Sequence, residues 1–268
     1  MLIRYGYDIT ITCPAPTALI CLLQAVTERG PDLVVPETFA TVPAHVPNTI
    51  YRDLFGNLCR RLTAPAGDFT LTSDATIRSG DSPDPVFPDA AEMPVADLPD
   101  DCLVYLMGSR YCETDRLSQI AWDLFGHLAP GWARVQAISD YVHDHIRFDY
   151  MQARATRTAY EAWQERIGVC RDFAHLGVAF CRCLNIPARY VNGYMGDIGV
   201  PVTGPMDFSA WTEVWLDGAW HTFDPRNNAR RIGRIVVARG RDAADVPLIN
   251  SFGPHVLKSF RVWTDPVG

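Results

Sequence analysis

Cys170 is the residue of this sequence best suited to act as a nucleophile. It lies in the segment Gly168-Val169-Cys170-Arg171-Asp172, where a glycine leads directly into an amphipathic stretch. The spacing of three or four between apolar residues predicts one buried helix face, formed by Val169, Phe173, Leu176, Phe180 and Leu184. Cys170 is therefore expected in the first turn of a helix, where unpaired N–H groups and the helix dipole favour the thiolate.

The elements around this helix predict a mixed architecture. Apolar residues at helical spacing predict two earlier helices, Asp115 to Leu128 and Trp132 to Ile146, and the Cys170 helix should end near Pro187. Strands are expected afterwards at Ala188–Met195, Phe208–Leu216, Ala219–Phe223 and Arg234–Ala238. Helices followed by antiparallel strands indicate an α+β core, which we assign to residues 102–268.

The first 80 residues predict a small β domain. Apolar residues alternate from Ile3 to Thr12, which is the period of a half-buried strand. Four more strands are expected at Ala18–Val26, Thr49–Phe55, Leu58–Thr63 and Asp68–Arg78, with a hairpin turn at residues 64–68. Residues 81–101 are rich in proline and aspartate and read as an extended linker.

Composition and charge narrow the classes of function. The 268 residues carry a formal net charge of −7, and the scattered basic residues argue against nucleic-acid binding. No signal peptide is recognised after Met1, and no apolar run reaches membrane-spanning length, so we expect a cytoplasmic protein without a membrane partner. The eight cysteines include no Cys-x-x-Cys pair, which favours free thiols over disulfides or a zinc site. Neither a metal nor another cofactor is expected, and the oligomeric state stays open.

Four segments together resemble a known family. They are Gly168–Ala174, Asn185–Tyr194, Ala210–Leu216 and Trp220–Pro225. In this order and spacing they resemble the bacterial transglutaminase-like family, whose core is papain-like. The segment Arg239–Val246 and an N-terminal β domain are similar to parts of family members, so the resemblance covers nearly the whole chain.

The resemblance implies a Cys-His-Asp site acting on an amide or ester. Cys170 matches the nucleophile, and Asp224 matches the acid that orients the histidine. The histidine should immediately precede Ala210-Trp211, where this sequence has Ser209. This departure matters, because a thiol needs a base to form the thiolate and an acid to protonate the leaving amine. Serine provides neither.

No other histidine is a convincing substitute. His221 precedes Asp224 by three on one expected strand, so the two should face opposite sides. His175 lies about 140° around the helix from Cys170.

Gln164, six residues before Cys170, is a candidate for an oxyanion-hole amide, and a surface glutamine is the alternative. Trp211 is a candidate for a substrate groove, and a core aromatic residue is the alternative. The backbone N–H of Cys170 is a further candidate oxyanion donor.

Two hypotheses for the function follow. The first is a cysteine enzyme that hydrolyses or transfers an acyl group from a peptide or another amide through a Cys170 thioester, with a mechanism altered by Ser209. The second is a catalytically impaired pseudoenzyme that binds a peptide or acts as a scaffold. A plain core cysteine is a third reading, which the four matching segments oppose. We favour the enzyme; the substrate stays open.

Overall fold

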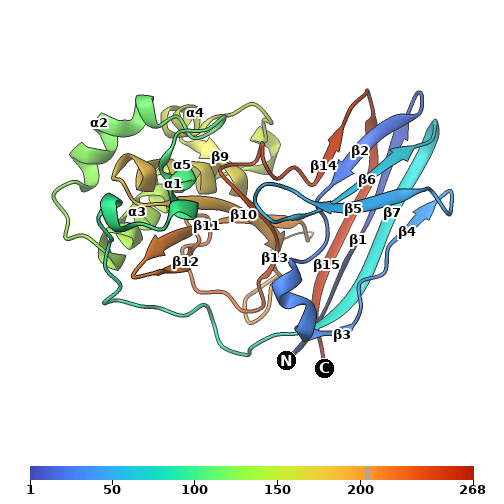
Figure 1. Ribbon diagram of the computed structural model, residues 1–268, viewed down its shortest axis with the longest axis horizontal. Helices are drawn as coiled ribbons and strands as arrows, with labels where there is room; N and C mark the ends of the chain where they lie inside the picture. The colour runs from blue at the N-terminus through green and yellow to red at the C-terminus, as the bar shows by residue number, and fades with distance from the viewer. Residues whose placement is uncertain (203, 205) are drawn as a thin grey trace.

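The computed structural model describes residues 1–202, 204 and 206–268, and its N-terminal part is a two-sheet β sandwich (Figure 1). One sheet has the order β15 (Val256–Val267), β1 (Leu2–Cys13), β7 (Gly67–Arg78) and β3 (Leu33–Val35), and β4 (Ala40–Val42) also pairs with β7. The other has the order β14 (Ile249–Ser251), β2 (Thr17–Cys21), β6 (Leu58–Ala64) and β5 (Asn48–Arg52). A 3₁₀ turn, η1 (Thr27–Asp32), precedes β3.

The predicted alternation in β1 is confirmed. Its inward-facing residues are at most 1 % exposed: Ile3, Tyr5, Tyr7, Ile9 and Ile11. The same pattern recurs in β7, where every second residue from Phe69 is buried. Period-two burial is what a strand requires when one of its faces covers a core.

The sandwich differs from the expected β domain in two respects. Strand β15 pairs with β1 from Leu2↔Val267 to Thr12↔Val256, and β14 pairs with β2, so residues 249–267 complete the sandwich. The core expected at residues 102–268 includes these residues. Strand β15 is mostly exposed and shows no clear alternation of buried and exposed residues, so hydrophobic periodicity does not reveal it. In addition, residues 64–68 join β6 and β7 in different sheets, so this turn is a corner between sheets and not a hairpin.

The second part of the chain is an α+β core, as predicted. Its helices are α1 (Asp100–Leu103), α2 (Thr114–Phe125), α3 (Trp132–His145), α4 (Ala159–Glu165) and α5 (Cys170–Cys183), with short 3₁₀ turns η2 (Val95–Asp97), η3 (Val104–Leu106) and η4 (Tyr150–Gln152). Its antiparallel sheet has the order β12 (Ala219–Phe223), β11 (Phe208–Leu216), β10 (Ala188–Tyr194) and β13 (Ile235–Gly240). Two short strands, β8 (Arg147–Phe148) and β9 (Ile167–Gly168), pair in parallel. Within the described residues, no helix has the length and apolarity needed to cross a membrane.

The sandwich and the core share a hydrophobic cluster. The ring of Tyr194 on β10 packs edge-on against Tyr5 on β1 with 5.0 Å between ring centroids, and its hydroxyl donates to the Leu23 carbonyl oxygen at 3.0 Å. Ile235 and Val237 on β13 belong to the same cluster. The core sheet therefore takes part of its packing from the sandwich.

The connection over residues 81–101 runs along the core (Figure 1). The carboxylate of Asp84 accepts from Arg234 Nε at 2.9 Å and from the Arg231 backbone N–H at 3.0 Å. Glu92 accepts from Arg134 at 3.0 Å. Proline keeps the segment extended, while these carboxylates fasten it to the core.

Gly6 on β1 tests how closely the sandwich strands pack. A Cβ at this position would lie 2.2 Å from the Ser73 carbonyl oxygen and 2.5 Å from the Trp263 ring. We expect Gly6→Ala to lower the free energy of unfolding by about 1–3 kcal/mol, the usual cost of overpacking. Urea denaturation measures this loss, with Gly80→Ala as the control, because a Cβ at Gly80 meets nothing within 4 Å. Equal stability of the two variants would contradict the packing described here.

Candidate active site

Cys170 is the first residue of α5 and is partly buried. The preceding Val169 is extended, with φ −114° and ψ 175°, so the chain turns into the helix directly before the thiol. The thiol opens on a pocket of about 420 Å³. Residues that line this Cys170 pocket include Phe148, Tyr150, Met195, Asp197, Asp207, Phe208, Ser209, Arg226 and Arg231.

The buried carboxylate of Asp172 fixes the start of α5. Its Oδ2 accepts from the Val169 backbone N–H at 2.9 Å and from Arg157 Nη1 at 3.1 Å, and its Oδ1 accepts from Arg171 Nη2 at 3.2 Å. Its side chain is fully buried, and that of Arg157 is only 3 % exposed. A carboxylate at this position satisfies a free N–H of the helix start and suits the positive end of the dipole.

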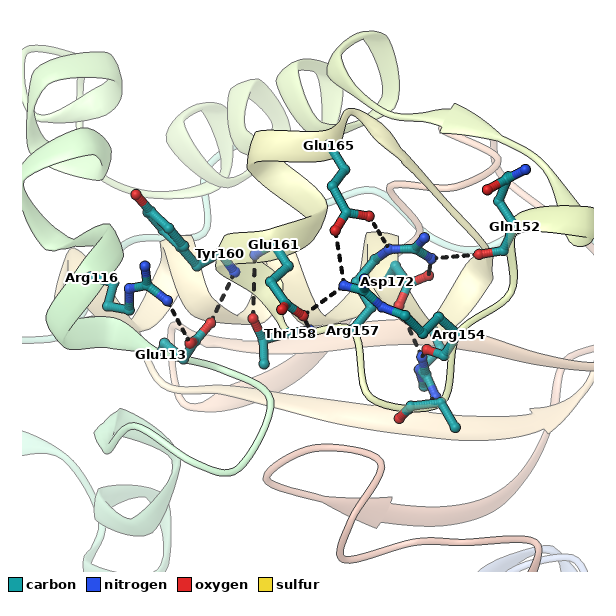
Figure 2. Close-up of polar contacts among 12 residues, drawn as sticks. Glu113, Arg116, Gln152, Arg154, Arg157, Thr158, Tyr160, Glu161, Glu165 and Asp172 are labelled. Atoms are coloured by element: carbon teal, nitrogen blue, oxygen red, sulfur yellow. Dashed lines mark hydrogen bonds and ion pairs between the residues drawn. The ribbon is translucent and has the colours of Figure 1, made fainter.

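Arg157 links this helix start to its neighbours (Figure 2). It donates to the carbonyl oxygen of Gln152 at 2.9 Å and to Glu165 on α4 at 3.0 Å, in addition to Asp172. Gln152 ends η4, the turn that carries Tyr150. One guanidinium therefore joins the segment carrying Tyr150 to the helix carrying Cys170.

The start of α4 belongs to the same network of polar contacts as Arg157 (Figure 2). Thr158 and Glu161 form a reciprocal capping box, with the Thr158 N–H donating to Glu161 at 3.0 Å. Arg154 pairs with both Glu161 and Glu165, at 2.8 and 2.9 Å. Such a box satisfies two of the N–H groups left free at a helix start.

The pKa of the Cys170 thiol is raised to about 11, in contrast to the lowered value expected from the helix start. Burial is the main cause, and the negative charge of Asp207 adds to it. Arg226 and the backbone N–H groups of Ala210 and Arg171 act in the opposite direction. A partly buried thiol beside a carboxylate prefers the neutral form, because loss of solvation and the neighbouring negative charge both penalise the thiolate.

Asp207 is the site residue that sequence reasoning missed. Burial raises the pKa of its carboxyl above the ordinary value, and the Phe208 N–H and a side-chain hydrogen bond with Tyr150 partly offset this. Tyr150 in turn has its pKa raised to about 12, mainly by burial and by the charge of Asp207. A signal was available in the sequence, since Asp207 precedes Ser209 by two and period two puts both on one side of the chain.

Ser209 lies on β11 opposite Gly193 of β10 and lines the Cys170 pocket. Cys170 and Ser209 thus line the same cavity.

Asp224 is not among the residues that line the Cys170 pocket. Its Oδ1 accepts from the Asn227 backbone N–H at 3.0 Å, and its Oδ2 accepts from Asn227 Nδ2 and Arg234 Nη2, both at 2.8 Å. Although burial opposes it, the Arg234 charge and the Asn227 hydrogen bonds hold the pKa of Asp224 below its usual value. The carboxylate expected to orient a histidine is held by an arginine.

Gln164 and Trp211 do not lie at the pocket. Gln164 is exposed and donates to the Tyr160 hydroxyl at 3.2 Å, as a surface glutamine would. Trp211 is fully buried, with Arg234 stacked 4.9 Å from its ring centroid, so it is a core aromatic residue. The two alternatives weighed from the sequence describe these residues better than the functional assignments.

No histidine is among the described residues that line the Cys170 pocket. His221 faces the other way, packed against Phe87 and Trp132. His175 is fully buried, and its Nε2 accepts from the Ala243 N–H at 3.1 Å. His143 Nδ1 lies 3.1 Å from the carbonyl oxygen of Arg226, so it contacts the loop behind the pocket. These imidazoles pack or support the fold.

Comparison with known proteins agrees with this architecture. A model of the transglutaminase-like superfamily matches residues 119–225, which include Cys170 and Asp224. A solved structure from Cytophaga hutchinsonii, provisionally described as a cysteine protease, superposes with a TM-score of 0.85 at 30 % identity. That match covers 99 % of this chain and 90 % of the other. The chain belongs to the transglutaminase-like superfamily.

Mycobacterial relatives of this transglutaminase-like protein are also found. An uncharacterized protein of Mycobacterium tuberculosis is 28 % identical over 236 residues, covering 76 % of this chain and 72 % of its own length. One of Mycobacterium leprae is 39 % identical over 85 residues, covering 30 % of this chain and 29 % of that protein.

Arg234 tests the electrostatics around Asp224 in this transglutaminase-like protein. It pairs with both Asp224 and Asp84, and the side chains of Arg234 and Asp224 are 7 % and 3 % exposed. We expect Arg234→Met to cost about 3–5 kcal/mol of unfolding free energy at pH 7, because it leaves a buried carboxylate unpaired. The folded-state pKa of Asp224 is depressed, so this stability is present above the unfolded value of about 3.9 and is lost as pH falls through the folded pKa.

The deficit of Arg234→Met should therefore shrink below about pH 4. Denaturation with urea at pH 7, 5 and 3.5 measures it, and Arg61→Met provides an exposed control. A deficit that does not change with pH would contradict the pairing as its source.

The thiol pKa predicts slow alkylation. We expect labelling of Cys170 by iodoacetamide to rise with a midpoint near pH 11, against about 8.5 for a free thiol. Peptide mass spectrometry across pH 6 to 11.5 measures the labelling rate, with N-acetylcysteine as reference. A midpoint below 8.5 would contradict the electrostatics described for the pocket.

Proposed function

We propose that the chain is a cysteine enzyme that hydrolyses or transfers the acyl group of an amide or ester through a Cys170 thioester. The observation that carries this proposal is the position of Cys170 at the start of α5, a helix end with free backbone N–H groups, where it lines a pocket of about 420 Å³. N–H groups at such a position stabilise the negative charge that develops on an attacked carbonyl oxygen. The provisional description of the Cytophaga hutchinsonii protein as a cysteine protease supports the same class of reaction.

The size of the pocket supports a small segment of a larger substrate. About 420 Å³ falls within the range of pockets that hold small ligands. A peptide or another amide therefore fits as the substrate class, and bond cleavage or transfer would depend on whether water or an amine attacks the thioester.

A pseudoenzyme is the second candidate, and a specific observation favours it. Ser209 cannot take a proton as an imidazole does, and Asp224 is held by Arg234 and Asn227. A chain that has kept the cleft but not the turnover would use the same pocket to bind a peptide.

Cys170→Ala separates the two candidates. We expect it to reduce turnover of p-nitrophenyl esters and peptide p-nitroanilides to the uncatalysed background, because the thioester cannot form. Mass spectrometry of the wild-type protein mixed with an ester should detect an acyl adduct on Cys170. Cys181→Ala is the matched control, since it removes a buried sulfur from the same helix away from the pocket. Turnover that survives in Cys170→Ala would reject the Cys170 thioester. Absence of both turnover and acyl adduct in the wild-type protein would favour the binding protein.

A further inference from the structure

Among the described residues, no histidine lines the Cys170 pocket, and the pocket contains the acidic residue Asp207. Asp207 directly precedes β11 and lines the pocket together with Cys170 and Ser209. Tyr150 lines the same pocket, so the three groups face one cavity, and the charge of Asp207 raises the pKa of both the thiol and the Tyr150 hydroxyl. Tyr150 comes from η4, Cys170 from α5 and Asp207 from the chain entering β11, so three separate elements converge here.

Asp207 is free to exchange a proton. Among residues 1–202, 204 and 206–268 it forms no salt bridge, whereas the pocket's other carboxylate, Asp197, pairs with Arg231 at 3.1 Å. Arg226 is the remaining cation that acts on the thiol, and its guanidinium stacks 4.3 Å from the Phe148 ring centroid. The groups that bear on the proton of Cys170 are thus Asp207, Tyr150 and Arg226. Tyr190 on β10 is coupled to the thiol as well, since burial and then the charge of Cys170 raise the pKa of Tyr190.

The Cys170 thiol and the Asp207 carboxyl carry one negative charge between them at neutral pH. The charge of Asp207 raises the pKa of Cys170, and burial raises the pKa of Asp207 itself. The resting pair at neutral pH is therefore a thiol beside a carboxylate, since two adjacent negative charges are costly. A preformed thiolate is not the resting state, so the proton must leave the sulfur as it attacks.

We infer that Asp207 is a catalytic residue that accepts the Cys170 thiol proton during attack on the acyl carbon and delivers it to the leaving group. This inference rests on the proposed thioester chemistry. It assigns to a carboxyl the task that the family resemblance assigns to a histidine.

The proton balance closes over both half-reactions. In acylation the C–S bond forms, the thiol proton moves to the Asp207 carboxylate, the C–N or C–O bond breaks, and that proton leaves on the amine or alcohol. In deacylation Asp207 takes a proton from the attacking water, the C–S bond breaks, and the proton returns to the sulfur. No oxidant or other co-reactant is needed. Tyr150 keeps the carboxyl in position by its hydrogen bond, and Arg226 offsets negative charge that develops at the sulfur.

Asp207→Asn gives opposite effects on two measurements. Loss of the negative charge lowers the thiol pKa, so alkylation of Cys170 by iodoacetamide at pH 8 should become faster, about tenfold for each unit of fall. Turnover of a p-nitroanilide should fall on the order of 10²–10⁴-fold, because proton transfer is lost. Turnover of a p-nitrophenyl ester with the same acyl group should fall less, since that leaving group needs less protonation. Asp144→Asn, an exposed change of the same charge on α3, is the control and should change neither rate.

Each outcome has a distinct meaning. Faster alkylation of Cys170 with slower anilide turnover supports the role of Asp207, provided that the buried Cys181 stays as slow to alkylate as in the wild-type protein. Unfolding would expose both thiols and speed the alkylation of both. Full turnover in Asp207→Asn together with none in Cys170→Ala overturns the role of Asp207 and leaves the proposed function intact. Full turnover in Cys170→Ala overturns the proposed function itself.

Tyr150→Phe provides a second variant if Asp207→Asn does not fold. The Tyr150 hydrogen bond lowers the pKa of Asp207, so its removal should raise that pKa. The acid limb of the pH profile of kcat/KM should then move to higher pH. An unchanged acid limb would overturn the assignment of Asp207 as the proton acceptor.

Discussion

The buried carboxylate of Asp172 is the constraint on which the site depends. It binds the N–H that precedes the thiol and pairs with Arg157, which also holds the end of η4 and Glu165 on α4. Both charges are almost completely removed from water, so the loss of one partner would leave an unpaired buried charge and strongly destabilise the fold. Three neighbouring segments, η4, α4 and the start of α5, are therefore held in one geometry, and Tyr150 and Cys170 line the same cavity.

A second buried pair explains how the fold tolerates Ser209. A carboxylate at Asp224 without an imidazole beside it would be an unpaired buried charge, which is expensive. Arg234 supplies the missing positive charge and also takes Asp84 from the connecting segment. An arginine stays protonated at every physiological pH, so it can stabilise Asp224 but cannot exchange a proton with the thiol. Asp224 is thereby held in the fold by Arg234, and under the proposal above the proton chemistry at Cys170 falls to Asp207.

Local patterns in the sequence predicted much of the fold. The alternation in β1, the helix that begins at Cys170 and the strands β10 to β12 depend on periodicity within short segments, which a sequence displays directly. Strand β15 escaped because an exposed edge strand needs only hydrogen bonds to a neighbour. The direction of the thiol pKa also could not be predicted, because it depends on burial and on Asp207, which approaches from another element. Gln164 and Trp211 were assigned by spacing and by side-chain type, and neither reports which way a side chain faces.

The pairing of β1 with β15 has a consequence for biosynthesis. Strand β1 (Leu2–Cys13) is synthesised long before its partner β15 (Val256–Val267), because most of the described chain lies between them. Until then, one edge of β1 carries unpaired N–H and C=O groups, which are a template for pairing with other chains. Contacts of such large sequence separation form slowly, because the chain loses the entropy of closing a long loop before the stabilising contacts form. The nascent protein thus has to shield an open sheet edge until β15 is made, a need that chaperones binding exposed strands could meet.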